Sequence, residues 1–190
     1  MNGETAFAQT RKCRFFKGNI MKRKLIFGIM SVILIVLDQL SKSWIVANLK
    51  GKENIVWIKG VFELEYLENT GAAFSSFMGK QGFLIGLTSL ILAFAVFEFI
   101  RVPKDKKYGI MEFAFALLIS GAIGNLIDRV KQNYVVDFLY FVPINFPRFN
   151  VADIYVTCSA ILIGVMFIFV YKDEETDFLF KFKKEKKAEE

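Results

Sequence analysis

Four long blocks of apolar residues organise the chain, and the segments between them carry most of the charge. Each block has about 18–23 residues. A helix that rises about 1.5 Å per residue needs that length to cross a hydrocarbon core of about 30 Å. The sequence therefore predicts a membrane protein with four transmembrane helices. The predicted spans cover about 25–47, 83–100, 110–127 and 154–171.

The segment between the first two spans has a different pattern. From Phe62 to Tyr66 apolar residues alternate with two glutamates, which is typical of a half-buried strand, and Asn69-Thr-Gly71 then ends the strand as a turn. An amphipathic loop is the alternative interpretation. The fold class that we expect is an all-α membrane protein with a small β-sheet or cradle on one side and a short segment between spans three and four.

Composition supports a membrane protein and removes several kinds of chemistry. Hydrophobic residues make up 54% of the chain, with 22 Phe, whereas a soluble domain is roughly 45–50% apolar. The absence of His excludes His-based general bases, Ser–His triads and imidazole metal sites. Two cysteines, Cys13 and Cys158, are too few for a zinc site or a disulfide framework. In a membrane chain the net charge of +6 indicates cytoplasmic loops, so we expect no nucleic-acid partner.

Lys and Arg residues predict the orientation of the chain. They gather before the first span, between spans two and three, and after span four, while the other two connections are nearly balanced in charge. The positive-inside rule places both termini and the 101–109 loop in the cytoplasm, and segments 48–82 and 128–153 outside.

The N-terminal segment also resembles a secretory signal peptide, because a basic stretch precedes an apolar run. The apolar block is longer than a typical signal core, however, and three further spans follow it. We therefore expect one membrane domain. Its organisation is a basic cytoplasmic leader over 1–24, a four-helix domain over 25–172 and a charged cytoplasmic tail over 173–190.

Polar residues within and beside the spans are concentrated near the outer surface. Asp38 follows thirteen non-ionisable residues, about 20 Å along the first helix, and Lys42 lies one turn further on the same face. This pair can simply neutralise itself, since a lone charge at this depth costs several kcal/mol. The inner halves hold only Glu98 and Glu112, at the cytoplasmic edge. One-sided clustering favours a site over independent structural accidents. The cluster comprises Asp38, Lys42, Asn69, Asn125, Asp128, Arg129, Asp137, Asn150 and Asp153.

Some of these features have structural explanations. Asp153 lies near the start of the fourth span, where an acid can cap a helix or interact with its dipole. Ser120, Gly121 and Gly124 offer a small-residue face for close helix packing. Asp137 stands alone in a hydrophobic run, and desolvation there tends to raise the pKa of a carboxyl group.

Without His, three ways of activating a nucleophile remain: a carboxylate pair, a Ser–Lys pair or a metal held by oxygen ligands. Ser41 and Ser43 flank Lys42, but neighbouring positions on a helix point apart. Ligand types alone leave an oxygen-ligated metal open. Asp137 and Asp153 form the best carboxylate pair, in which one acid acts as base and the other as acid on a water molecule. Peptide-bond hydrolysis at the membrane surface is therefore chemically reasonable.

Two non-hydrolytic functions are alternatives. A small transporter or ion-conducting protein would use the same intramembrane charges as a pathway, but it would need polar residues in both leaflets. A non-enzymatic scaffold of packed helices would leave the cost of the outer polar cluster unexplained.

Five short motifs follow one another along the chain: Asp38-Gln-Leu-Ser-Lys42, Asn69-Thr-Gly-Ala-Ala-Phe74, Gly121-Ala-Ile-Gly-Asn125-Leu-Ile-Asp-Arg129, Val135-Val-Asp137-Phe and Phe149-Asn-Val-Ala-Asp153. In this order and on the expected side of the membrane, they resemble the motifs of the bacterial lipoprotein signal peptidases (signal peptidase II). That resemblance implies a four-helix membrane aspartyl endopeptidase. Its substrate would be a diacylglyceryl-modified prolipoprotein, cut on the amino side of the lipidated Cys.

The resemblance also implies roles for individual residues. Asp137 and Asp153 would be the catalytic dyad, and Asp38 and Lys42 would brace the site. We expect no cofactor and no metal, a monomer in contact with membrane lipids, and a site at the extracytoplasmic surface of the bacterial cytoplasmic (inner) membrane. The remaining substrate-binding or supporting residues would be Asn69, Gly124, Asn125, Arg129 and Asn150.

Overall fold

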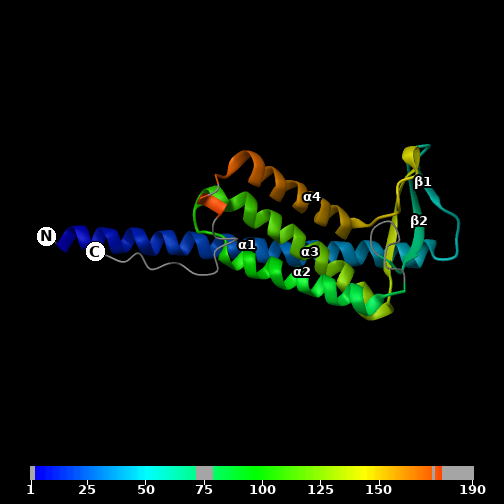
Figure 1. Cartoon of the computed structure of the whole chain (residues 1–190), viewed down its shortest axis with the longest axis horizontal. Coiled ribbons are helices and arrows are strands. Elements are labelled where there is room, and N and C mark those ends of the chain that lie inside the picture. The colour runs from blue at the N-terminus through cyan, green and yellow to red at the C-terminus, as the bar shows by residue number, and fades with distance from the viewer. Residues whose placement is uncertain (1–2, 72–78, 173, 177–190) are drawn as a thin grey trace.

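The long helices run along one another, and a small sheet stands across one end of the bundle (Figure 1). The computed structural model describes residues 3–71, 79–172 and 174–176, with side chains from residue 22 onwards. Within those residues, four helices are long and apolar enough to cross a membrane, which confirms the predicted fold class. The helices are α1 (Gly3–Leu49), α2 (Gln81–Arg101), α3 (Gly109–Gln132) and α4 (Val151–Val165), and a π-helical turn, η4 (Met166–Val170), continues α4.

Helix α1 begins well before the first predicted span, at Gly3 instead of near residue 25. The segment 3–24 contains no Pro and only two Gly, so its sequence offers no strong helix breaker before the apolar run. At about 1.5 Å per residue, the 47 residues of α1 extend about 70 Å. Its N-terminal part therefore projects beyond the other helices (Figure 1).

Helix α3 packs against each of the other three helices. Its most hydrophobic window is 61% buried, against 6–17% in the other spans. Small residues on α3 permit this approach: a Cβ atom on Gly121 would lie 2.5 Å from the carbonyl oxygen of Ala152 and 2.7 Å from Val156 Cγ2. The interpretation of this glycine as a close-packing position is thus confirmed, and it brings the start of α4 against α3.

At the end opposite the sheet, two buried acids form ion pairs, one between helices and one within α2. Arg23 on α1 donates to both oxygens of the fully buried Glu112, at 2.6 and 3.1 Å. Glu98 on α2 is also fully buried and lies 3.0 Å from Arg101. Each acid that the sequence places at the inner edge therefore has a cation beside it.

The sheet contains β1 (Ile55–Ile58), β2 (Phe62–Asn69) and β3 (Val135–Phe141) in the antiparallel order β1-β2-β3. Strand β2 confirms the alternating pattern read from the sequence. Strand β3 was missed, because its first four residues are buried and show no alternation between apolar and polar positions. Its residues Val136 and Phe138 pack on Ile45 and Leu49 at the end of α1, which anchors the sheet to the bundle.

An extra residue in β2 decides which face of the sheet Asn69 occupies. Leu64 pairs with Leu139 and Leu67 with Asp137, so three steps on β2 match two on β3. Side chains alternate between the faces of a strand, and this bulge reverses the alternation. Leu67 and Asn69 consequently lie on the same face as Asp137, where an unbulged strand would turn Asn69 away.

Candidate active site

The innermost part of the site is an ion cluster on α1 and α3. Lys42 lies 2.9 Å from Asp38 and 3.0 Å from Asp128, and all three side chains are nearly or fully buried. Gln39 donates to Asp38 at 3.2 Å and to Asp128 at 3.0 Å. The Asp38–Lys42 pair therefore forms as expected, but a second acid shares the cation, and this network fixes α1 against α3.

Asp38 also reaches the start of α4, where its Oδ1 accepts a hydrogen bond from the backbone N–H of Ala152 at 3.0 Å. Gly124 makes room for this carboxylate: a Cβ atom at that position would lie 2.5 Å from Asp38 Oδ2 and 3.2 Å from Ala152 Cβ. Absence of a side chain at Gly124 thus lets three helices meet at one buried acid.

Asn125 connects the ion cluster to the two acids of the predicted dyad. Its Oδ1 accepts from Lys42 Nζ at 2.9 Å and from Asn150 Nδ2 at 3.2 Å, and its Nδ2 donates to Asp153 Oδ1 at 2.8 Å. The amide is oriented by these partners, because the oxygen faces two donors and the nitrogen faces a carboxylate.

Asp153 takes part in a capping box at the start of α4. Asn150 is the N-cap residue, and its Oδ1 accepts from the N–H of Asp153 at 3.1 Å. Asp153 Oδ2 in turn accepts from the N–H of Asn150 at 3.0 Å. A structural role at the helix start is therefore present, and the same carboxylate faces the site; the two interpretations of Asp153 are compatible.

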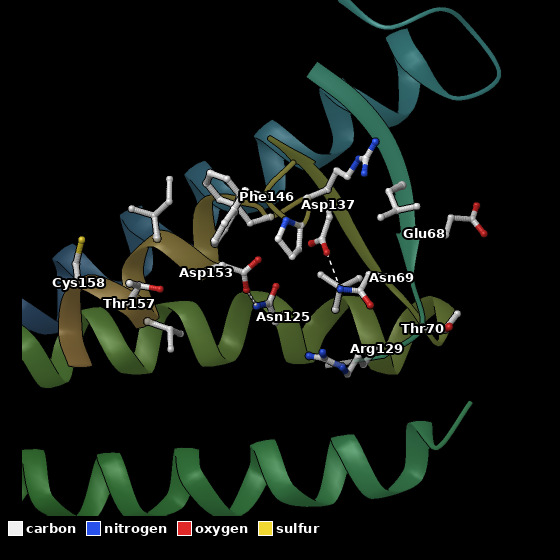
Figure 2. Close-up of a pocket in the computed structure, with 17 residues that line it drawn as sticks. Glu68, Asn69, Thr70, Asn125, Arg129, Asp137, Phe146, Asp153, Thr157 and Cys158 are labelled. Carbon is white, nitrogen blue, oxygen red and sulfur yellow. Dashed lines mark hydrogen bonds between the residues drawn. The ribbon is translucent and has the colours of Figure 1, made fainter. Parts of the chain in front are cut away.

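Asp137 is held by two side-chain amides. Asn69 Nδ2 donates to Asp137 Oδ2 at 2.7 Å, and Asn150 Nδ2 donates to Asp137 Oδ1 at 2.6 Å. Asn150 therefore contacts both acids, Asp137 through its side chain and Asp153 through its backbone. Figure 2 shows Asp137 and Asp153 beside the same cavity, with Asn69 and Asn125 as their neighbours.

This cavity has a volume of about 770 Å³ and opens between the sheet, α3 and α4. Its polar wall holds Asn69, Asn125, Arg129 and the two acids (Figure 2). The opposite wall is mainly apolar, with aromatic and aliphatic side chains from the loop before α4 and from the first turns of α4. The lining residues of that wall include Phe146, Pro147, Phe149, Ile154, Val156, Thr157 and Cys158.

Arg129 is nearly buried and has unused hydrogen-bonding capacity. Its Nη2 donates to the carbonyl of Gly71 at 3.1 Å, which ties α3 to the turn after β2. Among the described residues, its Nε is one of the few buried polar side-chain atoms without a partner. A donor left unpaired in a buried site costs roughly 1–3 kcal/mol, so a ligand that accepts from it gains affinity.

Burial and charge both act on Asp137. Asp137 is 2% exposed, and desolvation together with the nearby charge of Asp153 raises its pKa to about 7. The hydrogen bonds from Asn69 and Asn150 and the charge of Lys42 oppose this rise. At neutral pH a carboxyl group in this position exchanges its proton readily, which suits it to acid–base chemistry.

The structure thus brings every predicted site residue to one end of the bundle, and hydrogen bonds connect them. Sequence reasoning placed Asp128 in the outer polar cluster without giving it a role in the site, and it did not single out Gln39, although both stand inside the motifs. Asn69, Thr70 and Gly71 of the second motif are described, whereas its last three residues lie outside the described residues, as does the tail from residue 177. In the described part of the chain, no three His, Cys, Asp or Glu side chains converge in a way that could hold a metal ion.

Comparison with known proteins identifies the family of this chain. The family model described as signal peptidase (SPase) II matches residues 30–169. A lipoprotein signal peptidase from Clostridium tetani (strain Massachusetts / E88) is 44% identical over 150 residues, which are 77% of this chain and 92% of that protein. One from Lactococcus lactis subsp. lactis (strain IL1403) is 40% identical over 155 residues, covering 81% and 99%.

Solved structures agree in fold. One bacterial membrane enzyme matches with a TM-score of 0.68 at 29% identity, over 85% of this chain and 94% of its own. A second matches with a TM-score of 0.66 at 30% identity, over 77% and 94%. These similarities favour the peptidase interpretation over the transporter and the scaffold.

Proposed function

This chain belongs to the lipoprotein signal peptidase (signal peptidase II) family of membrane proteases, which remove signal peptides from prolipoproteins. We propose that it cleaves prolipoproteins as an aspartic endopeptidase whose catalytic dyad is Asp137 and Asp153. One observation carries the proposal: Asn150 contacts both carboxylates, at 2.6 Å and 3.0 Å, at the edge of a cavity of about 770 Å³. Two acids held this way can share one proton and activate a water molecule.

The proposed reaction is a direct attack by water on the scissile carbonyl. The ionised acid takes a proton from the water molecule while the water oxygen bonds to the carbonyl carbon. The protonated acid supports the developing oxyanion, and a proton then passes to the amide nitrogen as the C–N bond breaks. Each acid accepts two hydrogen bonds, Asp137 from Asn69 and Asn150 side chains and Asp153 from Asn125 and the N–H of Asn150. Because burial and the charge of Asp153 raise the pKa of Asp137, we assign the shared proton to Asp137 and the ionised form to Asp153.

The other polar residues hold this geometry or contact the substrate. Asn69, Asn125 and Asn150 keep the two acids in place, and Asp38, Lys42 and Gly124 brace the start of α4. Arg129 offers its Nε to a carbonyl of the substrate backbone, because the atom is buried beside the cavity and lacks a partner.

We further propose that the substrate carries a diacylglyceryl group and is cut on the amino side of the lipidated Cys. In support, the apolar wall of the cavity continues along α4, which exposes Ile154 and Ile161 at 39% and 60%. Acyl chains beside such a wall remain in an apolar environment while the peptide reaches the polar wall.

The proposed location is the bacterial cytoplasmic (inner) membrane, with the site outside and the termini inside. The basic segment of α1, the α2–α3 connection and the end of η4 lie at one end of the bundle, and the sheet and the site lie at the other (Figure 1). This distribution fits the positive-inside rule. We propose a monomer with one peptidase domain over 25–172, flanked by the leader (1–24) and the tail (173–190), because one chain supplies both acids and all their donors.

Cleavage of a synthetic lipopeptide in detergent tests the proposal. The wild-type protein should cut the peptide with a diacylglyceryl-Cys and leave the same peptide without the lipid largely intact. Asp137→Asn and Asp153→Asn should each abolish cleavage without changing the thermal midpoint by more than a few degrees, because Asn keeps the size of the side chain.

Asp105→Asn is the matched control. Asp105 is an exposed acid at the opposite end of the bundle, so its variant should cut at the wild-type rate. Full activity in either dyad variant would refute the catalytic assignment, and equal cleavage of the lipid-free peptide would refute the proposed substrate class.

A further inference from the structure

Arg148 lies where three segments of the active site meet. It belongs to the loop between β3 and α4 and lines the cavity. Its Nε and Nη2 donate to the same oxygen of Glu65 on β2, at 2.9 and 2.7 Å. Its guanidinium also lies over the ring of Tyr140 on β3, 4.0 Å from the centroid. One side chain therefore joins β2, β3 and the loop before α4.

Each of these segments supplies part of the proposed site. Glu65 precedes Asn69 by four residues on β2, and Tyr140 follows Asp137 by three on β3. Arg148 precedes Asn150 by only two residues, so its position controls where the capping box of α4 begins. The contacts made by Arg148 thus link the strand residues around Asp137 to the loop that positions Asp153.

Backbone hydrogen bonds also join the loop before α4 to strand β3. The N–H of Leu139 donates to the carbonyl of Phe149 at 2.8 Å, and the N–H of Phe149 donates to the carbonyl of Leu139 at 3.1 Å. The N–H of Phe138 also donates to the carbonyl of Phe149 at 3.0 Å, and the N–H of Phe146 donates to the carbonyl of Phe141 at 3.1 Å. These backbone bonds all join the loop to β3, whereas Arg148 adds a side-chain attachment to Glu65 on β2.

The contacts that Arg148 makes with Glu65 and Tyr140 require a guanidinium group. The side chains of Arg148 and Glu65 are 29% and 25% exposed, so the pair is only partly screened by water. A guanidinium can donate two hydrogen bonds to a carboxylate and contact the face of an aromatic ring at once, whereas a Lys ammonium is a single point charge. Because Glu65 and Tyr140 already engage the guanidinium, its contribution is to shape the cavity wall.

We propose that Glu65, Arg148 and Tyr140 form a clamp that positions the loop before α4, so that Asn150 and Asp153 lie correctly opposite Asp137. The three residues act through the dyad and are positioning residues. This inference rests on the proposed function of the dyad, and it assigns to this chain a determinant of turnover outside the five motifs.

A double-mutant cycle tests the clamp. Glu65→Gln, Arg148→Gln and the double variant are compared with wild type for kcat and KM on the diacylglyceryl lipopeptide. Each single variant should lower kcat about five- to tenfold and change KM less than about twofold, because misplaced acids impair the chemical step more than binding. The double variant should lose no more than about the larger single effect, since both substitutions break one interaction.

Conservative and distant variants sharpen the test. Arg148→Lys keeps the charge and should recover only part of kcat, because it cannot make the two bonds and the ring contact together. Lys107→Gln removes an exposed ion pair with Glu175 at the other end of the bundle and should leave kcat and KM unchanged.

Amide hydrogen exchange gives a measurement that does not depend on activity. Exchange over residues 146–153 should rise in the Glu65 and Arg148 variants and stay at the wild-type level in Lys107→Gln. An unchanged kcat in both single variants, multiplying losses in the double variant, or unchanged exchange over 146–153 would each overturn the clamp. Failure of the dyad itself would appear separately, as activity retained by the Asp137 or Asp153 variants.

Discussion

Substitution of Gly124 by Ala is the smallest change that should damage the site, because it adds one methyl group where three helices meet. The new Cβ atom would lie 2.5 Å from Asp38 Oδ2, 3.1 Å from Asp38 Cγ and 3.2 Å from Ala152 Cβ. The carboxylate must therefore move, and with it the hydrogen bond to the N–H of Ala152 and the contact with Lys42.

The magnitude follows from opposing contributions. Overpacking a buried site costs about 1–3 kcal/mol. Complete loss of a hydrogen bond to a charged group costs roughly 1.5–3 kcal/mol, and weakening the bond costs less. Ala improves helix propensity over Gly by up to about 1 kcal/mol. We expect Gly124→Ala to lower the free energy of unfolding by about 2 kcal/mol, which corresponds to a fall of roughly 4–8 °C in thermal midpoint.

Catalysis should suffer more than stability. Asp153 lies in the first turn of α4 and directly follows Ala152, whose N–H donates to Asp38. Any shift of that turn therefore moves the carboxylate. A displacement of about 1 Å can cost on the order of 100-fold in rate, so we expect kcat to fall at least about tenfold.

The assay compares three glycine variants by thermal unfolding in detergent and by cleavage of the lipopeptide. Gly86→Ala is the matched control, because it lies inside α2 with nothing within 4 Å of the new Cβ atom. Gly121→Ala strains the α3–α4 contact through Ala152 and Val156 without touching Asp38. If Gly124→Ala were as stable and as active as Gly86→Ala, the packing argument would be wrong.

Further predictions concern charge and protonation. The pKa of Asp137 is raised to about 7 from about 4 in an unfolded chain. Between those values the folded protein keeps a proton that the unfolded chain releases, so stability should fall as pH rises through roughly 4–7 and Asp137→Asn should flatten this trend in thermal melts. The pH–rate profile should be bell-shaped, because one acid must be ionised and the other protonated; a rate still rising at high pH would contradict this. Asn69→Ala removes a donor that lowers the pKa of Asp137, so the alkaline limb of the profile should move to higher pH. Lys42→Met leaves Asp38 and Asp128 buried without their shared cation, which should cost about 3–5 kcal/mol, and an unchanged melt would argue against the ion cluster. EDTA should leave the rate unchanged, whereas inhibition reversed by a divalent ion would indicate a metal.

Sequence reasoning was most successful for features that depend on local composition. The membrane spans follow from the length of each apolar block, because the cost of placing a residue in lipid is set mainly by that residue and its neighbours. The polar cluster follows from the same logic, since Asp38, Lys42 and Arg129 are too costly in hydrocarbon without partners. The start of α1 was missed, because helix formation continues through a polar segment that lacks a breaker.

The sequence did not predict which residues far apart in the chain contact one another. The first four residues of β3 are buried on both faces, so their pattern does not distinguish the strand from other apolar runs, and only its pairing with β2 makes it a strand. The bulge in β2 turns Asn69 toward Asp137, and the alternation of apolar and polar residues in β2 does not predict this bulge. Lys42 was expected to pair with Asp38, but contact between α1 and α3 also gives it Asp128.

By itself, then, the amino-acid order determined which segments enter the membrane and which side chains need protection there. Only the tertiary structure decided which acid meets which amide, because hydrogen bonds act over about 3 Å and depend on helix crossings and strand register. Asp153 illustrates the difference: its position at a helix start can be read from the chain, whereas its proximity to Asp137 exists only once Asn150 joins α4 to the sheet.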